Sequence, residues 1–116
     1  MLKIALIEDD DNLVSLIKEN IELELRCELN ICQSEKRIEE LLKKQASYDL
    51  IVCRNLKGSS NTPLKLATRL IKKNRQDPVL IIDHEDPVLD IDYQFLPYEN
   101  FDIGTLIRKV TEITDP

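Results

Sequence analysis

Charged residues stand directly after three of the apolar runs in the sequence. They are Glu8 and Asp9 after the first run, Arg54 after the third and Asp83 after the fourth. If these runs are neighbouring parallel strands, their carboxyl ends meet at one rim of a sheet. Open α/β proteins bind their ligands in a crevice at this rim. Three carboxylates crowded at such a rim repel one another unless a cation balances part of their charge.

Arg54 is a cation that can balance this charge. Its guanidinium stays protonated and can bond two carboxylates at once, while it repels a metal ion from the same place. We therefore expect an internal ion cluster of Arg54 with Glu8, Asp9 and Asp83. The alternative is that Arg54 turns outward into solvent, where an ion pair is worth less than about 1 kcal/mol.

The elements that must position these residues alternate between short apolar runs and stretches of helical periodicity. The runs predict five strands, over 2–7, 27–32, 50–53, 78–82 and 93–96. Helical spacing predicts four full helices, over 12–25, from 34, from 62 and over 101–113. This order is typical of a parallel sheet covered by helices on both faces.

Each predicted helix has an apolar stripe, and the first three also have a start signal. The stripes are Leu13, Leu16, Ile17 and Ile21; Ile38, Leu41 and Leu42; Leu64, Ala67, Leu70 and Ile71; and Ile103, Leu106, Ile107 and Val110. The expected caps are Asp10 or Asp11, Ser34, and Thr62 with proline at the first helical position. Between the fourth and fifth strands, Pro87 and the charges before it leave no room for a full helix. Exposed apolar side chains in that connection, at Pro87, Val88, Leu89 and Ile91, are a candidate contact patch.

Composition narrows the classes of partner. The 116 residues contain 16 Lys and Arg against 22 Asp and Glu, a net charge of -6. This balance offers no basic surface for nucleic acid or for an anionic membrane. The apolar runs are too short to span a bilayer, and the start lacks a secretory signal, so we expect a cytoplasmic protein. Cys27, Cys32 and Cys53 are expected to be free thiols, with the first two on opposite faces of the sheet.

Over residues 2 to about 114, the order of elements resembles the receiver domain of bacterial response regulators. The resemblance rests on the acids Glu8-Asp9-Asp10 after the first strand, on the strand spacing and on Leu96-Pro97-Tyr98 after the fifth. It implies a single α/β domain over 1–116 with the flavodoxin-like (βα)5 three-layer sandwich. The five-stranded parallel sheet would have the order 2-1-3-4-5, with the fourth helix shortened or missing. Whether an effector domain follows residue 116 stays open.

The resemblance also implies functional roles for residues at the rim, and most of the residues that would fill these roles are replaced here. In the family an acidic pair holds Mg²⁺, and Glu8 and Asp9 match it. The family's phosphoryl-accepting aspartate falls on Arg54, its switch hydroxyl on Asp83 and its lysine on Leu96. A guanidinium has no lone pair for attack on phosphorus. Three of the reactive groups are therefore replaced, and Glu8 and Asp9 are a vestigial metal pair.

Two other positions still match the family. Tyr93 falls on the switch aromatic, and Pro97 follows a peptide bond that is often cis in such domains. We interpret both as structural remnants or parts of a contact surface.

These observations favour a pseudo-receiver of two-component or phosphorelay signalling. It would not be phosphorylated and would not be an enzyme, and it would bind a protein partner in one constitutive conformation. We expect no cofactor, with Mg²⁺ binding lost or weak. One alternative is a working receiver phosphorylated at an unusual residue. The other is a regulatory domain of a fused effector, or one that senses a small ligand at the altered rim. The partner, the pathway and a homodimer stay open.

Overall fold

The computed structural model describes residues 1–115, and Pro116, the last residue of the predicted domain, lies outside the described residues. Its strands are β1 (Leu2–Ile7), β2 (Cys27–Cys32), β3 (Leu50–Arg54), β4 (Val79–Asp83) and β5 (Gln94–Pro97). They form one parallel sheet in the order β2-β1-β3-β4-β5. This order confirms the predicted flavodoxin-like topology.

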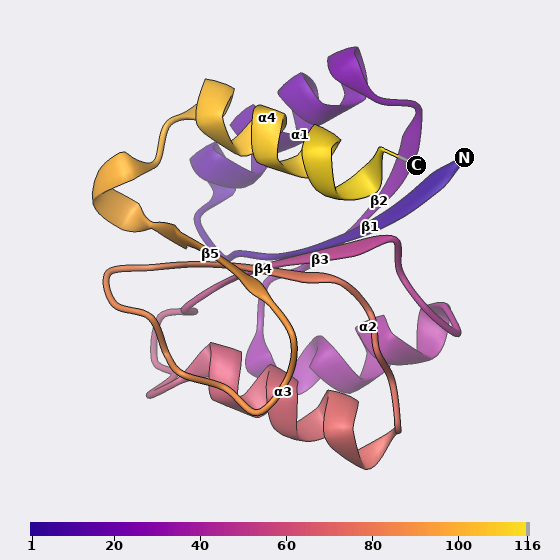
Figure 1. The fold of residues 1–116 in the computed structure, drawn as a ribbon, viewed down its shortest axis with the longest axis vertical. Coiled ribbons are helices and arrows are strands. Elements are labelled where there is room, and N and C mark those ends of the chain that lie inside the picture. Colours follow the sequence, from indigo (N-terminus) through magenta and orange to yellow (C-terminus); the bar gives the residue numbers. More distant parts are fainter. Residues whose placement is uncertain (116) are drawn as a thin grey trace.

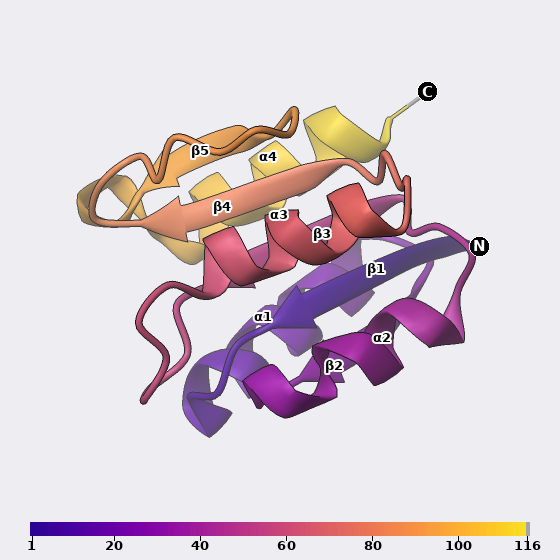
Figure 2. The same cartoon turned by 90° about the horizontal axis from the view of Figure 1, so that it is seen from below.

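Helices cover both faces of the sheet. They are α1 (Asp11–Glu24), α2 (Ile38–Lys44), α3 (Thr62–Lys72) and α4 (Ile103–Thr114), with short 3₁₀ turns η1 (Glu35–Arg37) and η2 (Tyr98–Asn100). Figure 1 shows α1 and α4 on one face and α2 and α3 on the other. Seen from below in Figure 2, the strands run side by side between these layers. None of the helices in residues 1–115 is long and apolar enough to cross a membrane.

The central strands are buried on both faces, because side chains alternate along a strand. In β3, Ile51 and Cys53 join the core under α2 and α3, while Leu50 and Val52 join the core under α1 and α4. Burial raises the pKa of the Cys53 thiol well above its ordinary value. The three cysteines are free, and Cys27 and Cys32 lie against opposite cores, as predicted.

The predicted stripes of α1 and α3 are partly wrong. In α1 the buried side chains include Val14 rather than Leu16, which is exposed. In α3 they include Leu66, while Leu64 and Ile71 are exposed. In both helices, apolar residues occupy two overlapping sets of helically spaced positions. Periodicity alone does not decide which of the two sets faces the sheet.

The helix starts agree with the prediction only in part. Asp10 caps α1, with its carboxylate accepting from the backbone N–H of Asn12 and Leu13. The cap of α3 is Asn61 rather than Thr62, because Thr62 is buried and its hydroxyl accepts from Leu56 N at 2.9 Å. Ser34 is the N-cap residue of η1 but makes no side-chain capping bond, which also departs from the prediction.

The connection between β4 and β5 contains no helix, as predicted. The expected apolar patch on it is nevertheless mostly wrong, because Leu89 and Ile91 pack against the core under α2 and α3. Val88 alone is strongly exposed, at 82 %, and its φ of 52° lies in the left-handed region. The extended connection thus covers the sheet where a helix would otherwise lie.

Candidate functional site

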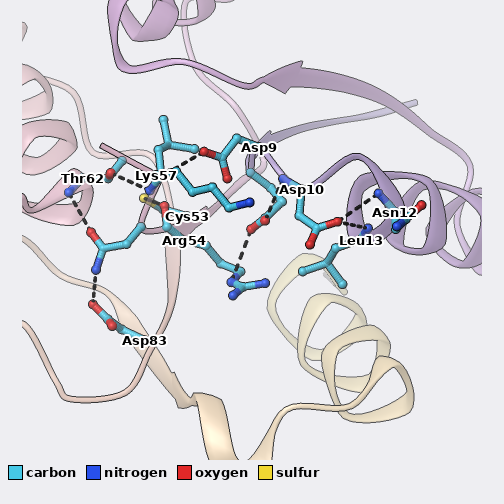
Figure 3. A network of polar contacts seen from close by, with 12 residues as sticks. Asp9, Asp10, Asn12, Leu13, Cys53, Arg54, Lys57, Thr62 and Asp83 are labelled. Atoms are coloured by element: carbon cyan, nitrogen blue, oxygen red, sulfur yellow. Dashed lines mark hydrogen bonds and ion pairs between the residues drawn. The ribbon is translucent and has the colours of Figure 1, made fainter. Parts of the chain in front are cut away.

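The rim at the carboxyl ends of the strands brings the predicted site residues close together. Arg54 is the last residue of β3 and Asp83 the last of β4, and these strands are paired. Glu8 follows directly after β1, which pairs β3 on its other side. Figure 3 shows the side chains of this rim with their polar contacts.

Glu8 is buried, with only 2 % of its surface exposed. Its Oε1 accepts a hydrogen bond from Asp10 N at 3.1 Å. Its Oε2 lies 3.3 Å from Arg54 Nε, an ion-pair distance, but receives no hydrogen bond of good geometry. Burial raises the pKa of Glu8, and the nearby Arg54 guanidinium only partly offsets this effect.

Arg54 turns inward, and its side chain is 19 % exposed. Its guanidinium carbon lies 4.8 Å from the centre of the Tyr98 ring and 6.0 Å from that of Phe101. The two rings are stacked, with centroids 6.0 Å apart, and His84 packs on Tyr98 at 4.9 Å. The guanidinium therefore sits between a buried carboxylate and an aromatic face, which suits a delocalised cation.

The expected cluster of three carboxylates around Arg54 is wrong in its detail. Among residues 1–115, Glu8 is the only acid with which Arg54 forms an ion pair. Asp9 accepts instead from Lys57 N at 2.7 Å and so ties the loop after β3 to the end of β1. The contact between Asp9 and Lys57 is drawn in Figure 3.

Asp83 is held away from Arg54 by a side-chain amide. Asn55 Nδ2 donates to Asp83 Oδ2 at 2.8 Å, and Asn55 Oδ1 accepts from Thr62 N at 2.9 Å. The other oxygen of Asp83 accepts from His84 N at 2.7 Å. Asn55 thus separates the two acidic parts of the rim, which sequence reasoning missed because an amide after a strand carries no distinctive spacing.

The remaining predicted positions are structural. Leu96 is buried in the core under α1 and α4, where it offers no charge to the rim. Tyr93 lies just before β5, packs against the opposite core and donates its hydroxyl hydrogen to Asp86. The peptide bond before Pro97 is trans, contrary to the expectation from the resemblance.

Tyr98 and Phe101 are the site residues that sequence reasoning overlooked. Tyr98 belongs to the Leu96-Pro97-Tyr98 motif, but the motif does not indicate that its ring would face Arg54. In residues 1–115, no three side chains of His, Cys, Asp or Glu are grouped so that they could hold a metal ion. At the rim, the guanidinium of Arg54 faces Glu8 and the ring of Tyr98.

Comparison with known proteins identifies the fold. No protein-family model and no curated protein match the chain significantly. A response regulator receiver domain protein from Bacillus halodurans has a TM-score of 0.81 at 19 % identity, over 99 % of this chain and 97 % of that one. The chemotaxis protein CheY4 of Vibrio cholerae has a TM-score of 0.75 at 12 % identity, over 97 % and 98 %.

A longer protein contains the same fold. NtrX from Brucella abortus has a TM-score of 0.76 at 17 % identity, over 98 % of this chain but only 27 % of that one. The likeness covers nearly the whole of this chain, and therefore all three layers of its sandwich. The chain therefore has the fold of the receiver domains of response regulators.

Proposed function

We propose that the chain is a pseudo-receiver, a non-enzymatic signalling module that acts without phosphorylation. The observation that carries the proposal is the placement of Arg54 at the end of β3, facing the buried Glu8 at 3.3 Å. In receiver domains this position holds the aspartate that accepts the phosphoryl group. A guanidinium offers no nucleophilic oxygen and stays protonated.

The neighbouring positions support the same proposal. A phosphoryl group at this rim would need donors for its oxygens and cations for its charge. Asp83 is an anion already bonded to Asn55, and Leu96 is an apolar side chain in the core. Neither can supply the hydroxyl or the amine that the resemblance assigns to these positions.

We further propose that Arg54 replaces Mg²⁺ as the cation of this site. The residues do not fit the metal well, because Glu8 Oε2 faces the guanidinium and Asp9 Oδ2 is bonded to Lys57 N. A divalent ion beside Arg54 would also be repelled by its charge. A titration with Mg²⁺ followed by calorimetry should show no saturable binding in the low-millimolar range. Saturable binding there would contradict the replacement.

The output in this proposal is binding of a protein, either a separate partner or a fused effector domain. The example of NtrX, in which this fold spans 27 % of the chain, shows that a receiver fold can be part of a longer protein. A pull-down that compares the full-length protein with residues 1–116 would separate the two arrangements. A partner captured equally by both indicates a separate protein.

The central test uses acetyl phosphate and intact-mass spectrometry, with a phosphorylatable receiver domain treated in parallel. We expect no adduct on this chain. The variant Arg54→Asp should also stay unmodified, because Asp83 and Leu96 still lack the hydroxyl and the amine. A stable gain of one phosphoryl mass on the unaltered chain would overturn the proposal. It would instead indicate a working receiver with an unusual acceptor, which peptide mapping would locate.

A further inference from the structure

A groove of about 800 Å³ lies between the end of α3 and the β4–β5 connection, and we call it the α3 groove. On one wall is Ile71 of α3, an aliphatic side chain that is 53 % exposed. On the other wall are Leu89 and Ile91, which are only partly buried against the core under α2 and α3. Figure 1 shows the connection, drawn in orange, passing beside α3. The groove therefore exists because an extended segment runs where a helix would otherwise lie.

The wall formed by the connection is fixed within the fold. The carboxylate of Asp86 accepts from Val88 N at 3.0 Å and from the hydroxyl of Tyr93. Leu89 and Ile91 follow this turn and pack against the core. A ligand that enters the groove therefore meets a preformed wall and loses little affinity to the ordering of the chain.

The same wall is acidic. From Gln76 to Ile107 the chain contains eight Asp and Glu and no Lys or Arg. Two of these acids, Asp90 and Asp92, are exposed and line the groove, and neither forms an ion pair within residues 1–115. The α3 groove thus combines aliphatic walls with two uncompensated negative charges.

The basic residues near this end of α3 do not cancel the charge. Arg75 is the one cation in the lining, and it is already bonded to both oxygens of Asp77. Lys73 turns towards α2, where its Nζ lies 3.0 Å from Glu39 Oε2. Lys72 is exposed but does not line the groove. The local field therefore attracts a cationic ligand.

We propose that the α3 groove binds a segment of a partner protein in which apolar side chains alternate with or adjoin Lys or Arg. The apolar side chains cover Ile71 and lie against Leu89 and Ile91, while the cations pair with Asp90 and Asp92. An apolar centre with complementary charge around it is typical of protein interfaces. Nucleic acid and anionic membranes are repelled by the same acids. The inference rests on the part of the proposed function that assigns protein binding as the output, and it does not depend on Arg54.

Three short fluorescent peptides test the chemistry of the ligand by anisotropy. The first alternates Leu with Lys, the second Ser with Lys and the third Leu with Glu. The Leu–Lys peptide should bind at least about tenfold more tightly than the Ser–Lys peptide, because it also covers the aliphatic walls. The Leu–Glu peptide should not bind. Equal binding of the two Lys peptides, or no binding of the Leu–Lys peptide, would overturn the proposal.

A pair of matched substitutions in α3 locates the site. Ile71→Ser should weaken the binding of the Leu–Lys peptide at least about tenfold, since it removes the apolar contact. Leu64→Ser is the control, because Leu64 is 50 % exposed on the same helix but lies outside the groove. It should leave the affinity unchanged, and circular dichroism checks that both variants fold. Equal losses for the two variants would contradict the assignment of the groove.

Neutral amides test the role of the acids. Asp90→Asn with Asp92→Asn should weaken the binding of both Lys peptides and make it less dependent on salt. Glu22→Gln with Glu24→Gln removes two exposed acids from α1, outside the groove, and should change neither. If both double variants had the same effect, general attraction to an acidic chain would explain the binding and the proposal would fail. Acetyl phosphate remains a separate readout, so an unmodified chain that binds no peptide would refute this inference alone.

Discussion

Residues 1–115 hold two largely buried arginine–carboxylate pairs, one at each end of the strands, and they are built differently. At the edge where the strands begin, Arg75 contacts both oxygens of Asp77, at 2.8 Å and 3.0 Å, and Tyr48 N donates to the same carboxylate at 2.7 Å. At the opposite rim, Arg54 approaches Glu8 through a single contact of 3.3 Å. One oxygen of Glu8 is left without a hydrogen bond.

The difference appears in the pKa of each carboxyl group. Burial alone would raise the pKa of Asp77, but hydrogen bonds from Arg75 and Tyr48 N lower it overall. Burial also raises the pKa of Glu8, and there the single arginine does not compensate. A buried carboxylate is stabilised by complete hydrogen bonding rather than by the mere presence of a cation. The carboxylate of Asp77 is therefore fully bonded within the fold, while that of Glu8 keeps one oxygen without a hydrogen-bond donor.

The largest expected effect is on the pair of Arg75 with Asp77. Asp77→Ala should lower the free energy of unfolding by about 3–5 kcal/mol, because it leaves Arg75 and Tyr48 N without their acceptor in a buried place. Urea denaturation measures the change. Asp90→Ala, an exposed acid near the same edge, is the control and should change little. A small loss for Asp77→Ala would show that the two pairs do not differ as described.

The pH dependence of stability should have opposite signs for the two carboxyl groups. Asp77 has a pKa below its ordinary 3.8, so it contributes stability above that value that is lost as the pH falls through the lowered pKa. Glu8 has a pKa above its ordinary 4.5, so stability falls as the pH rises from 4.5 through the raised pKa.

Unfolding curves at a series of pH values test this contrast. Asp77→Asn should flatten the acid side of the stability profile, below 3.8. Glu8→Gln should remove a decline that begins above 4.5. If both variants altered the profile in the same direction, the contrast between the edges would be lost.

The smallest expected effect comes from replacing the rim pair as a whole. Glu8→Gln combined with Arg54→Met should change the free energy of unfolding by less than about 1 kcal/mol, because the incomplete pair does not recover the cost of its burial. The matched double variant, Asp77→Asn with Arg75→Met, should be clearly destabilising, since it also removes the bond from Arg75 to Leu42 O. Chemical denaturation of the two double variants compares them directly. Equal losses would contradict the distinction.

Much of the fold follows from the sequence, because strands buried on both faces are short, continuous apolar runs. The predicted bounds of β1 and β2 agree with the structure, and so does the absence of a helix before β5. The side of a helix that faces the sheet was less certain, since Leu16 and Val14 satisfy similar spacings. It depends on tertiary packing that no local pattern contains.

The site was predictable in its members but not in its contacts. Strand ends placed Glu8, Arg54 and Asp83 at one rim, yet Asn55 binds Asp83 and separates it from the arginine. A short polar side chain bonds whichever group lies within a few ångströms of it. The spacing of residues along the chain does not specify distances this small. The ring of Tyr98 beside Arg54 is another contact of this kind.

The β4–β5 connection is held by side chains rather than by backbone hydrogen bonds. No backbone–backbone hydrogen bond lies within residues 85–92 of the described chain. The carboxylate of Asp86 instead fixes the turn, accepting from Val88 N at 3.0 Å and from the hydroxyl of Tyr93. Besides the packing of Leu89 and Ile91, the segment is held by one hydrogen-bonding side chain, so substitutions can reshape it and leave the sheet ladder intact. Divergence between related sequences should therefore concentrate in this stretch, and chain insertions should be tolerated there with little effect on folding.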